Sequence, residues 1–165
     1  MQLTKRLPGK SNKELMVFLH NVSNNVKPSQ LERAAELKKA IYAEWSVRNT
    51  DFLAGRAVEM MQADGVLSAF GYRVGDTGVS KQRARLAILA LVLEAPIPPI
   101  VDPEYTREWG LPKSEARIQK LTRTLKGLIS GVERRSSNSR VAYARALTQW
   151  QSDLAIVPQL AASCQ

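Results

Sequence analysis

The stretch SEARIQKLTRTLKGLISGVER, residues 114–134, decides the fold class of this chain. Ser114 is a residue type that caps helix N-termini, and an apolar stripe follows it at helical spacing. The stripe consists of Ile118, Leu121, Leu125, Leu128 and Val132. We therefore predict a long amphipathic helix from Ser114 to about Arg134, with one face buried and the other in solvent.

The rest of the chain shows the same helical period, and no β-type alternation persists beyond a few residues. Residues 14–22 are apolar enough to form a short helix or to dock on the body of the fold. We expect further helices over 29–47, 49–61, 81–94, 103–109 and 139–157. Ser29 with Glu32 fits a capping box for the first of these longer helices, and Asn49 or Thr50 fits the cap of the next. The segment 65–79 holds four glycines and is expected to form a loop, with room for one short pair of strands.

These elements predict an all-α fold, a single-domain helical bundle of about five to six helices. The domain is expected over residues 29–157. Residues 1–28 are expected to form a flexible basic arm followed by a short apolar segment, because Pro8, Gly9 and small polar residues interrupt the arm. Residues 158–165 are expected to be a C-terminal tail.

Composition bounds the class of protein. The chain has 165 residues, of which 44% are hydrophobic and 24% charged, as in a globular domain. Its one cysteine, Cys164, excludes an intramolecular disulfide. The longest early apolar run, Leu15 to Leu19, is shorter than a signal-peptide core or a membrane span. We therefore expect a cytoplasmic protein that makes no use of a membrane.

Charge is concentrated in two segments. The net charge is +9. Residues 113–145 hold nine lysines and arginines against two glutamates. Residues 1–13 hold no acid and four cations, namely Lys5, Arg6, Lys10 and Lys13. Such concentration favours a polyanionic partner, nucleic acid first and an acidic protein surface second.

Familiar catalytic and metal-binding patterns are missing from the sequence. His20 is the only histidine, and no C-x-x-C, H-x-x-x-H or phosphate-loop motif occurs. We therefore expect no enzyme, no metal and no cofactor. The segment GYRVG (71–75) with Gly78 offers one possible anion contact, through backbone amides and Arg73. The alternative is that its glycines only allow positive φ angles in a turn.

The predicted helix 114–134 segregates its charges. With Arg117 at zero and about 100° per residue, the apolar stripe falls between roughly 20° and 120°. The cations fall between roughly 180° and 300° on that wheel, and both glutamates lie outside this arc. These cations are Lys120, Arg123, Lys126 and Arg134, with Arg135 directly after them. A generic solvent face mixes both signs, so this arc is a candidate ridge for phosphates.

Gly127 and Gly131 lie on the same side of the predicted helix. Each costs about 1 kcal/mol relative to alanine in a helix interior, so a reason for their presence is needed. Small residues four positions apart let a second helix approach closely. The last helix of the chain, or a partner, is therefore a candidate cover for part of the ridge.

Several short motifs together resemble an uncharacterised family of small bacterial proteins. They are Glu44-Trp45, GYRVG (71–75), Arg85 with Ile88-Leu89, Pro98, EWGLP (108–112) with Ser114, Arg117 and Lys120-Leu121, and Trp150 with Asp153-Leu154. The resemblance covers about residues 40–155. It implies a bacterial, cytoplasmic protein built as one helical unit, and it brings no established activity and no catalytic residues.

The sequence thus favours a non-enzymatic accessory protein that contacts DNA or RNA along the phosphate backbone. The expected contacts are Lys120, Arg123, Lys126, Arg134 and Arg135, with Lys5, Arg6, Lys10 and Lys13 from the arm and Arg73 as a separate anion contact. Few amides or aromatics interleave with the ridge, so we expect little sequence preference. The alternative is a protein-interaction module that binds an acidic partner or self-associates through the Gly127/Gly131 face.

Overall fold

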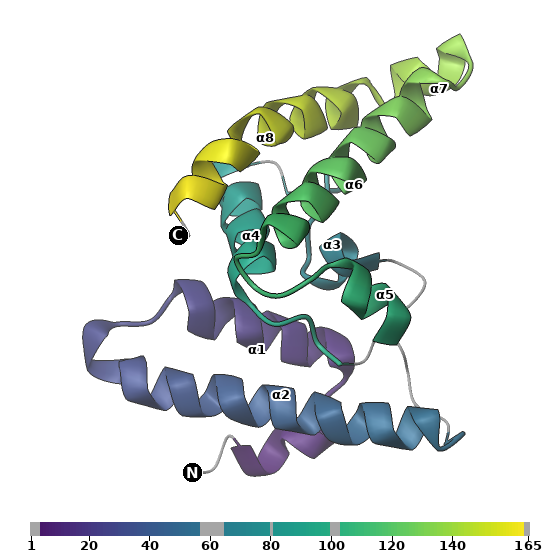
Figure 1. Cartoon of the computed structure of the whole chain (residues 1–165). Helices are drawn as coiled ribbons and strands as arrows, with labels where there is room; N and C mark the ends of the chain where they lie inside the picture. The colour runs from purple at the N-terminus through teal and green to yellow at the C-terminus, as the bar shows by residue number, and fades with distance from the viewer. Residues whose placement is uncertain (1–3, 57–64, 80, 100–102, 164–165) are drawn as a thin grey trace. The chain divides into compact units, whose positions relative to one another are not determined.

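A computed structural model describes residues 4–56, 65–79, 81–99 and 103–163 (Figure 1). Within these ranges the chain forms eight α-helices and two 3-10 helices and contains no strand. The predicted all-α class is confirmed, and the short strand pair expected over 65–79 is absent from the described part of that segment. The helices in these ranges outnumber the five to six expected because five of them have six residues or fewer, too short to produce a periodic pattern.

The chain divides into two compact units. Unit 1 comprises residues 1–71 and 97–106, and unit 2 comprises residues 72–96 and 107–165. The boundaries expected from the sequence, at residues 28 and 157, do not coincide with these units. Among the helices in the described ranges, none has the length and apolar character that crossing a membrane requires.

Unit 1 is built around the helices α1 (Asn12–Asn24) and α2 (Leu31–Leu53). The 3-10 helix η2 (Pro28–Gln30) lies in the connection between them. The two helices contact each other, and η1 (Thr4–Gly9) contacts α2. Fully buried side chains of this unit include Leu15, Leu19, Ile41 and Trp45. The short helix α3 (Gly65–Ala69) also lies in unit 1 and buries Val66 and Leu67.

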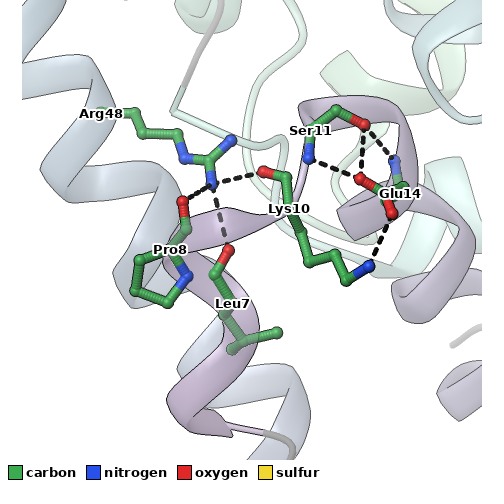
Figure 2. Close-up of polar contacts among 6 residues, drawn as sticks. All are labelled: Leu7, Pro8, Lys10, Ser11, Glu14 and Arg48. Atoms are coloured by element: carbon green, nitrogen blue, oxygen red, sulfur yellow. Dashed lines mark hydrogen bonds and ion pairs between the residues drawn. The ribbon is translucent and has the colours of Figure 1, made fainter.

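The flexible N-terminal arm is the main correction to the sequence prediction. Residues 4–9 form η1 with Leu7 buried, and Ser11 begins α1 through a complete capping box with Glu14. Arg48 of α2 anchors this segment, donating to the carbonyl oxygens of Leu7 at 3.2 Å and Lys10 at 2.7 Å (Figure 2). Local composition suggested mobility, but the anchor is tertiary and lies 38 to 41 residues away in sequence.

The other differences in unit 1 concern helix boundaries. Ser29 lies inside η2, and α2 begins at Leu31, so the predicted capping box is replaced by a 3-10 turn. Asn49 and Thr50 lie in the interior of α2, which continues to Leu53 without a second cap. The predicted end of that second helix, at Met60 and Met61, lies outside the described residues.

Unit 2 is a bundle of three main helices, α4 (Gln82–Glu94), α6 (Glu115–Glu133) and α8 (Ala144–Ser163). The short α5 (Pro103–Glu108), whose residues 103–106 belong to unit 1, precedes α6 in the chain. The short α7 (Ser137–Ala142) joins α6 to α8. Figure 1 shows α6 and α8 side by side with α7 at the far end of this hairpin. The predicted central helix 81–94 is confirmed, since α4 buries Ile88, Leu89 and its neighbours.

The C-terminal end of the chain differs from the expected tail. The predicted helix 139–157 is divided into α7 and α8, and α8 continues through Pro158 to Ser163. Val157 and Ala161 on either side of the proline are both buried, so burial of this face carries the helix past a residue that lacks an N–H. Residues 80 and 102, which directly precede the helices predicted over 81–94 and 103–109, lie outside the described residues.

Candidate nucleic-acid interface

The rotation of α6 about its axis decides which of its side chains reach solvent. Ser114 is the N-cap, as predicted, and its hydroxyl accepts the Arg117 N–H at 3.2 Å. Leu121, Leu125 and Val132 of the predicted stripe are buried. Ile129 is buried in place of Leu128, which is 38% exposed. The buried face of α6 therefore differs from the predicted stripe by one residue at this position.

Arg117 fixes this rotation from inside the fold. Its side chain is 1% exposed and donates to four carbonyl oxygens. They belong to Val92 at 2.7 Å, Ala95 at 3.0 Å, Trp109 at 2.9 Å and Gly110 at 2.8 Å. One guanidinium thus joins the C-terminal end of α4 to the turn before α6. The sequence signal was present, because Arg117 precedes Leu121 by four residues and Leu125 by eight, in the buried row.

Gly110 in the same turn has a conformational reason. Its φ is +66°, and a Cβ atom there would lie 2.9 Å from the Ala116 Cβ. The motif EWGLP therefore supplies a backbone carbonyl for Arg117 at a position that suits only glycine.

A buried polar cluster holds α8 against α4. Asp153 is fully buried and accepts hydrogen bonds from Arg85 Nε at 2.6 Å, Arg85 Nη2 at 3.0 Å and the Tyr72 hydroxyl at 2.9 Å. Burial and the adjacent carboxylate raise the pKa of Tyr72 above its ordinary value of 10.0, so the phenol remains a donor. The hydrogen bond to Asp153 raises the pKa of Arg85 in turn. Sequence reasoning missed this cluster, although Arg85 is a charged residue within a nearly all-apolar helix.

With α6 held by Arg117 and α8 held by the Asp153 cluster, one basic face of α6 remains in solvent. Arg123, Lys126 and Arg134 are exposed, and none of them forms an ion pair with any carboxylate in the described part of the chain. We call these three residues the α6 ridge. They lie on one face at spacings of three and eight residues, with the half-buried Ser130 between the last two.

Lys120, the fourth predicted member of this face, is placed differently. Its side chain is 21% exposed and its Nζ lies 2.5 Å from the Glu108 carboxylate. Lys120 therefore serves the junction between α5 and α6 rather than the open ridge.

The end of the α6–α8 hairpin extends the basic surface. We call residues 135–145 the hairpin tip; every side chain described there is exposed. Arg135 lies over the ring of Tyr143, with its Cζ atom 5.2 Å from the ring centroid. Arg140 is exposed on α7, and Arg145 pairs with Asp76 at 3.1 Å in solvent. An exposed ion pair of this kind contributes little to stability and is readily exchanged for another anion.

Helix α8 does not pack against Gly127 or Gly131. Both are exposed, and a Cβ atom built at either position has no heavy atom within 4 Å. The face of α6 between Lys126 and Arg134 is therefore open within unit 2, and the predicted cover by α8 is wrong.

The N-terminal cations belong to unit 1. Lys5, Arg6 and Lys13 are exposed, whereas Lys10 pairs with Glu14 at 2.8 Å. Figure 2 shows Lys10 reaching the Glu14 carboxylate that also completes the Ser11 capping box. These cations lie on η1, on α1 and in the turn between them, and not on a flexible arm.

Backbone groups of the glycine segment 71–78 form hydrogen bonds within the fold, and the Arg73 side chain extends into solvent. Arg73 is exposed and its carbonyl accepts the Val79 N–H at 3.0 Å. The Gly75 N–H donates to Gln149 Oε1 at 2.8 Å, and the Gly78 N–H donates to the Gly75 carbonyl at 3.3 Å. Gly71 and Gly75 adopt φ of +83° and +84°, which favours the turn interpretation of these glycines.

Two further observations limit what the site is. No group of three or more histidine, cysteine, aspartate or glutamate side chains suited to a metal ion occurs among the residues with described positions. Comparison of the chain with protein-family models, with curated proteins and with solved structures finds no match. The functional assignment therefore rests on the geometry of unit 2.

Proposed function

We propose that this chain is a non-enzymatic nucleic-acid-binding protein whose unit 2 binds the phosphate backbone along the α6 ridge. The observation that carries the proposal is the exposure of Arg123, Lys126 and Arg134 on one helix face with no carboxylate partner in the described residues. An internal ion pair would have to be broken before binding a phosphate, and these three side chains require no such exchange. Each phosphate neutralised releases condensed counterions, which is the main source of non-specific affinity.

The ridge has a length suited to several nucleotides. Arg123 and Arg134 are eleven residues apart in sequence. At about 1.5 Å per residue they lie about 16 Å apart along the helix axis. That length corresponds to about five nucleotides at about 3.4 Å per nucleotide on one strand. The open backbone at Gly127 and Gly131 leaves no side chain to hold a strand away from the helix.

The ridge itself predicts affinity without sequence choice. Contacts to phosphate, which we propose for the ridge arginines, position a nucleic acid, whereas amide side chains that contact base edges help to specify its sequence. The ridge presents no asparagine or glutamine between Arg123 and Arg134. We propose in addition, from the motif resemblance, that the protein is bacterial and cytoplasmic, and that the exposed N-terminal cations and Arg73 add secondary contacts.

Fluorescence anisotropy of labelled oligonucleotides tests the proposal. The ridge variant carries Arg123→Glu, Lys126→Glu and Arg134→Glu. The matched control carries Lys5→Glu, Arg6→Glu and Lys13→Glu, which changes the net charge by the same amount on exposed residues of unit 1. Far-UV circular dichroism checks that both variants remain folded.

The ridge variant is expected to lose binding at a salt concentration where wild type binds, while the control loses much less. Equal losses in both variants would show that affinity follows net charge and not the ridge. Absence of binding by wild type at low salt would reject the proposed function.

The same face supports a second candidate, a protein-interaction module. Gly127, Gly131 and the partly exposed Leu128 together form a surface that a second helix can approach closely. Self-association through this face predicts a sedimentation coefficient that rises with protein concentration and falls back to the monomer value in Gly131→Trp. An acidic protein partner would instead compete with nucleic acid for the ridge.

A further inference from the structure

The hairpin tip carries an aromatic–cation pair in solvent. Tyr143 lies in the turn between α7 and α8 and is 42% exposed. Arg135 follows α6, and its guanidinium lies 5.2 Å from the centroid of the Tyr143 ring. Helix α7 returns the chain so that two residues eight positions apart meet. The pair is therefore a consequence of the α6–α7–α8 topology and not of local sequence.

The chain segment that carries this pair is strongly basic, and the carboxylate of Asp76, from another segment, pairs with Arg145 alone among its arginines in the described residues. No aspartate or glutamate occurs between Glu133 and Asp153, whereas the same segment holds Arg134, Arg135, Arg140 and Arg145. A surface of this kind complements a polyanion that also presents flat, partly apolar groups.

Single-stranded nucleic acid is a polyanion that also presents accessible flat base faces, whereas a duplex is a polyanion whose base faces are covered. In a duplex the base faces are covered by neighbouring bases, so an exposed tyrosine has nothing to stack on. In a single strand the bases can stack on an aromatic ring or on an arginine plane, and every base has a face that allows it.

We propose that the hairpin tip binds single-stranded nucleic acid, with an unpaired base stacked on the Arg135–Tyr143 pair and adjacent phosphates bound by Arg134 and Arg140. This inference rests on the proposed function, because the α6 ridge supplies the phosphate contacts that bring a strand to the tip. It narrows the ligand class from nucleic acid in general to single strands, and it names Tyr143 as the residue that discriminates them.

An anionic membrane surface is the competing ligand for arginines beside an aromatic residue. Membrane-surface helices need a broad apolar face that sinks into the headgroup region. Helix α7 has six residues, and Val141 and Tyr143 are the large apolar side chains exposed on the described tip. This small apolar area favours stacking with a base over insertion into lipid.

The test compares three 20-nucleotide probes by fluorescence anisotropy: oligo(dT), oligo(U) and a DNA duplex. The variants are Tyr143→Ala, Tyr143→Phe, and Val141→Ala as a matched loss of apolar surface at the same tip. Tyr143→Ala is expected to weaken binding of both single strands roughly tenfold, with a change below about threefold for the duplex. Tyr143→Phe restores the affinity because it keeps the ring, and Val141→Ala behaves as wild type.

A second readout is independent of affinity. Photo-crosslinking with an oligonucleotide that contains 5-iodouridine is expected to label Tyr143 or a residue of the tip. A crosslink confined to unit 1 would overturn the proposal. Vesicles of anionic phospholipid form a third arm, and tight binding to them with loss in Tyr143→Ala would assign the tip to a membrane instead.

Failure of this inference is distinguishable from failure of the proposed function. If single strands and duplex bind equally and the ridge variant abolishes both, with no effect of Tyr143→Ala, the tip inference is wrong and the ridge proposal stands. If wild type binds no probe at low salt, both are rejected.

Discussion

Replacing Asp153 by asparagine tests whether the buried cluster holds α8 on α4 and thereby positions the α6–α8 hairpin. Asp153 is fully buried and Arg85 is 3% exposed, so water does not screen the pair. Removing one partner of a buried ion pair leaves a charge without compensation and costs about 3–5 kcal/mol. Asparagine keeps one acceptor oxygen, so we expect Asp153→Asn to lower the free energy of unfolding by about 3 kcal/mol.

Tyr72→Phe measures the contribution of a single hydrogen bond in the same cluster, with which the loss in Asp153→Asn is compared. It removes the 2.9 Å hydrogen bond from the phenol to Asp153 and leaves the ion pair in place. Hydrogen bonds to charged groups contribute about 1.5–3 kcal/mol, so a loss of about 1.5 kcal/mol is expected. The double variant Arg85→Met/Asp153→Leu should lose less than the sum of its single variants, because both buried charges are then gone.

Urea unfolding followed by far-UV circular dichroism measures these losses, and amide hydrogen exchange locates them in α4 and α8. The reasoning is refuted if Asp153→Asn costs less than about 1 kcal/mol, or if Tyr72→Phe costs as much as Asp153→Asn.

Three further predictions concern other anchors of the fold. Arg117→Lys keeps the charge but not the fork that reaches four carbonyls, so it should lower stability in urea unfolding by about 2 kcal/mol or more; an unchanged midpoint would contradict the role of the fork. Gly131→Ala should raise stability by about 0.5–1 kcal/mol, because the added Cβ meets nothing within 4 Å; destabilisation would mean that this face is covered. Hydrogen bonds from Lys10 and from the Ser11 backbone and hydroxyl lower the pKa of Glu14 from 4.5 to about 2, so Glu14 contributes stability above its unfolded pKa and loses it as pH falls from about 4.5 towards 2. The stability difference between wild type and Glu14→Gln should therefore shrink over that pH range, and a constant difference would count against the capping carboxylate.

Local rules in the sequence predicted α4 and α6 of unit 2 well, whereas α8 has other bounds than expected. The Ser114 cap and the stripe of α6 are both determined within the helix itself, and only the positions of Leu128 and Ile129 relative to solvent differ. The same holds for α4, whose nearly all-round apolar composition is typical of a buried helix.

Tertiary contacts account for what the sequence did not predict. The N-terminal segment is ordered because Arg48, in another helix, binds its carbonyls; the Ser11-x-x-Glu14 signature was a local clue to the helix that follows. The partners of Arg117 and Asp153 come from several elements, so the residue types were visible and their pairing was not. The Arg135–Tyr143 pair likewise requires α7 to reverse the chain.

The basic face of α6 was predictable as a set of residues but not as a surface. The helical wheel placed Lys120 with Arg123, Lys126 and Arg134, because a wheel contains no neighbouring helices. Lys120 differs from the other three cations because it forms an ion pair with Glu108 at the end of α5.

The salt dependence of nucleic-acid binding tests the central claim most directly. The slope of log K against log salt concentration on a single strand is measured for wild type, for Arg123→Gln/Lys126→Gln/Arg134→Gln, and for Lys120→Gln as the control on the same helix. Loss of three phosphate contacts is expected to make the slope shallower by about 2, at about 0.7 per contact, while Lys120→Gln leaves it nearly unchanged. A triple variant with the wild-type slope would show that the α6 ridge does not bind the phosphate backbone.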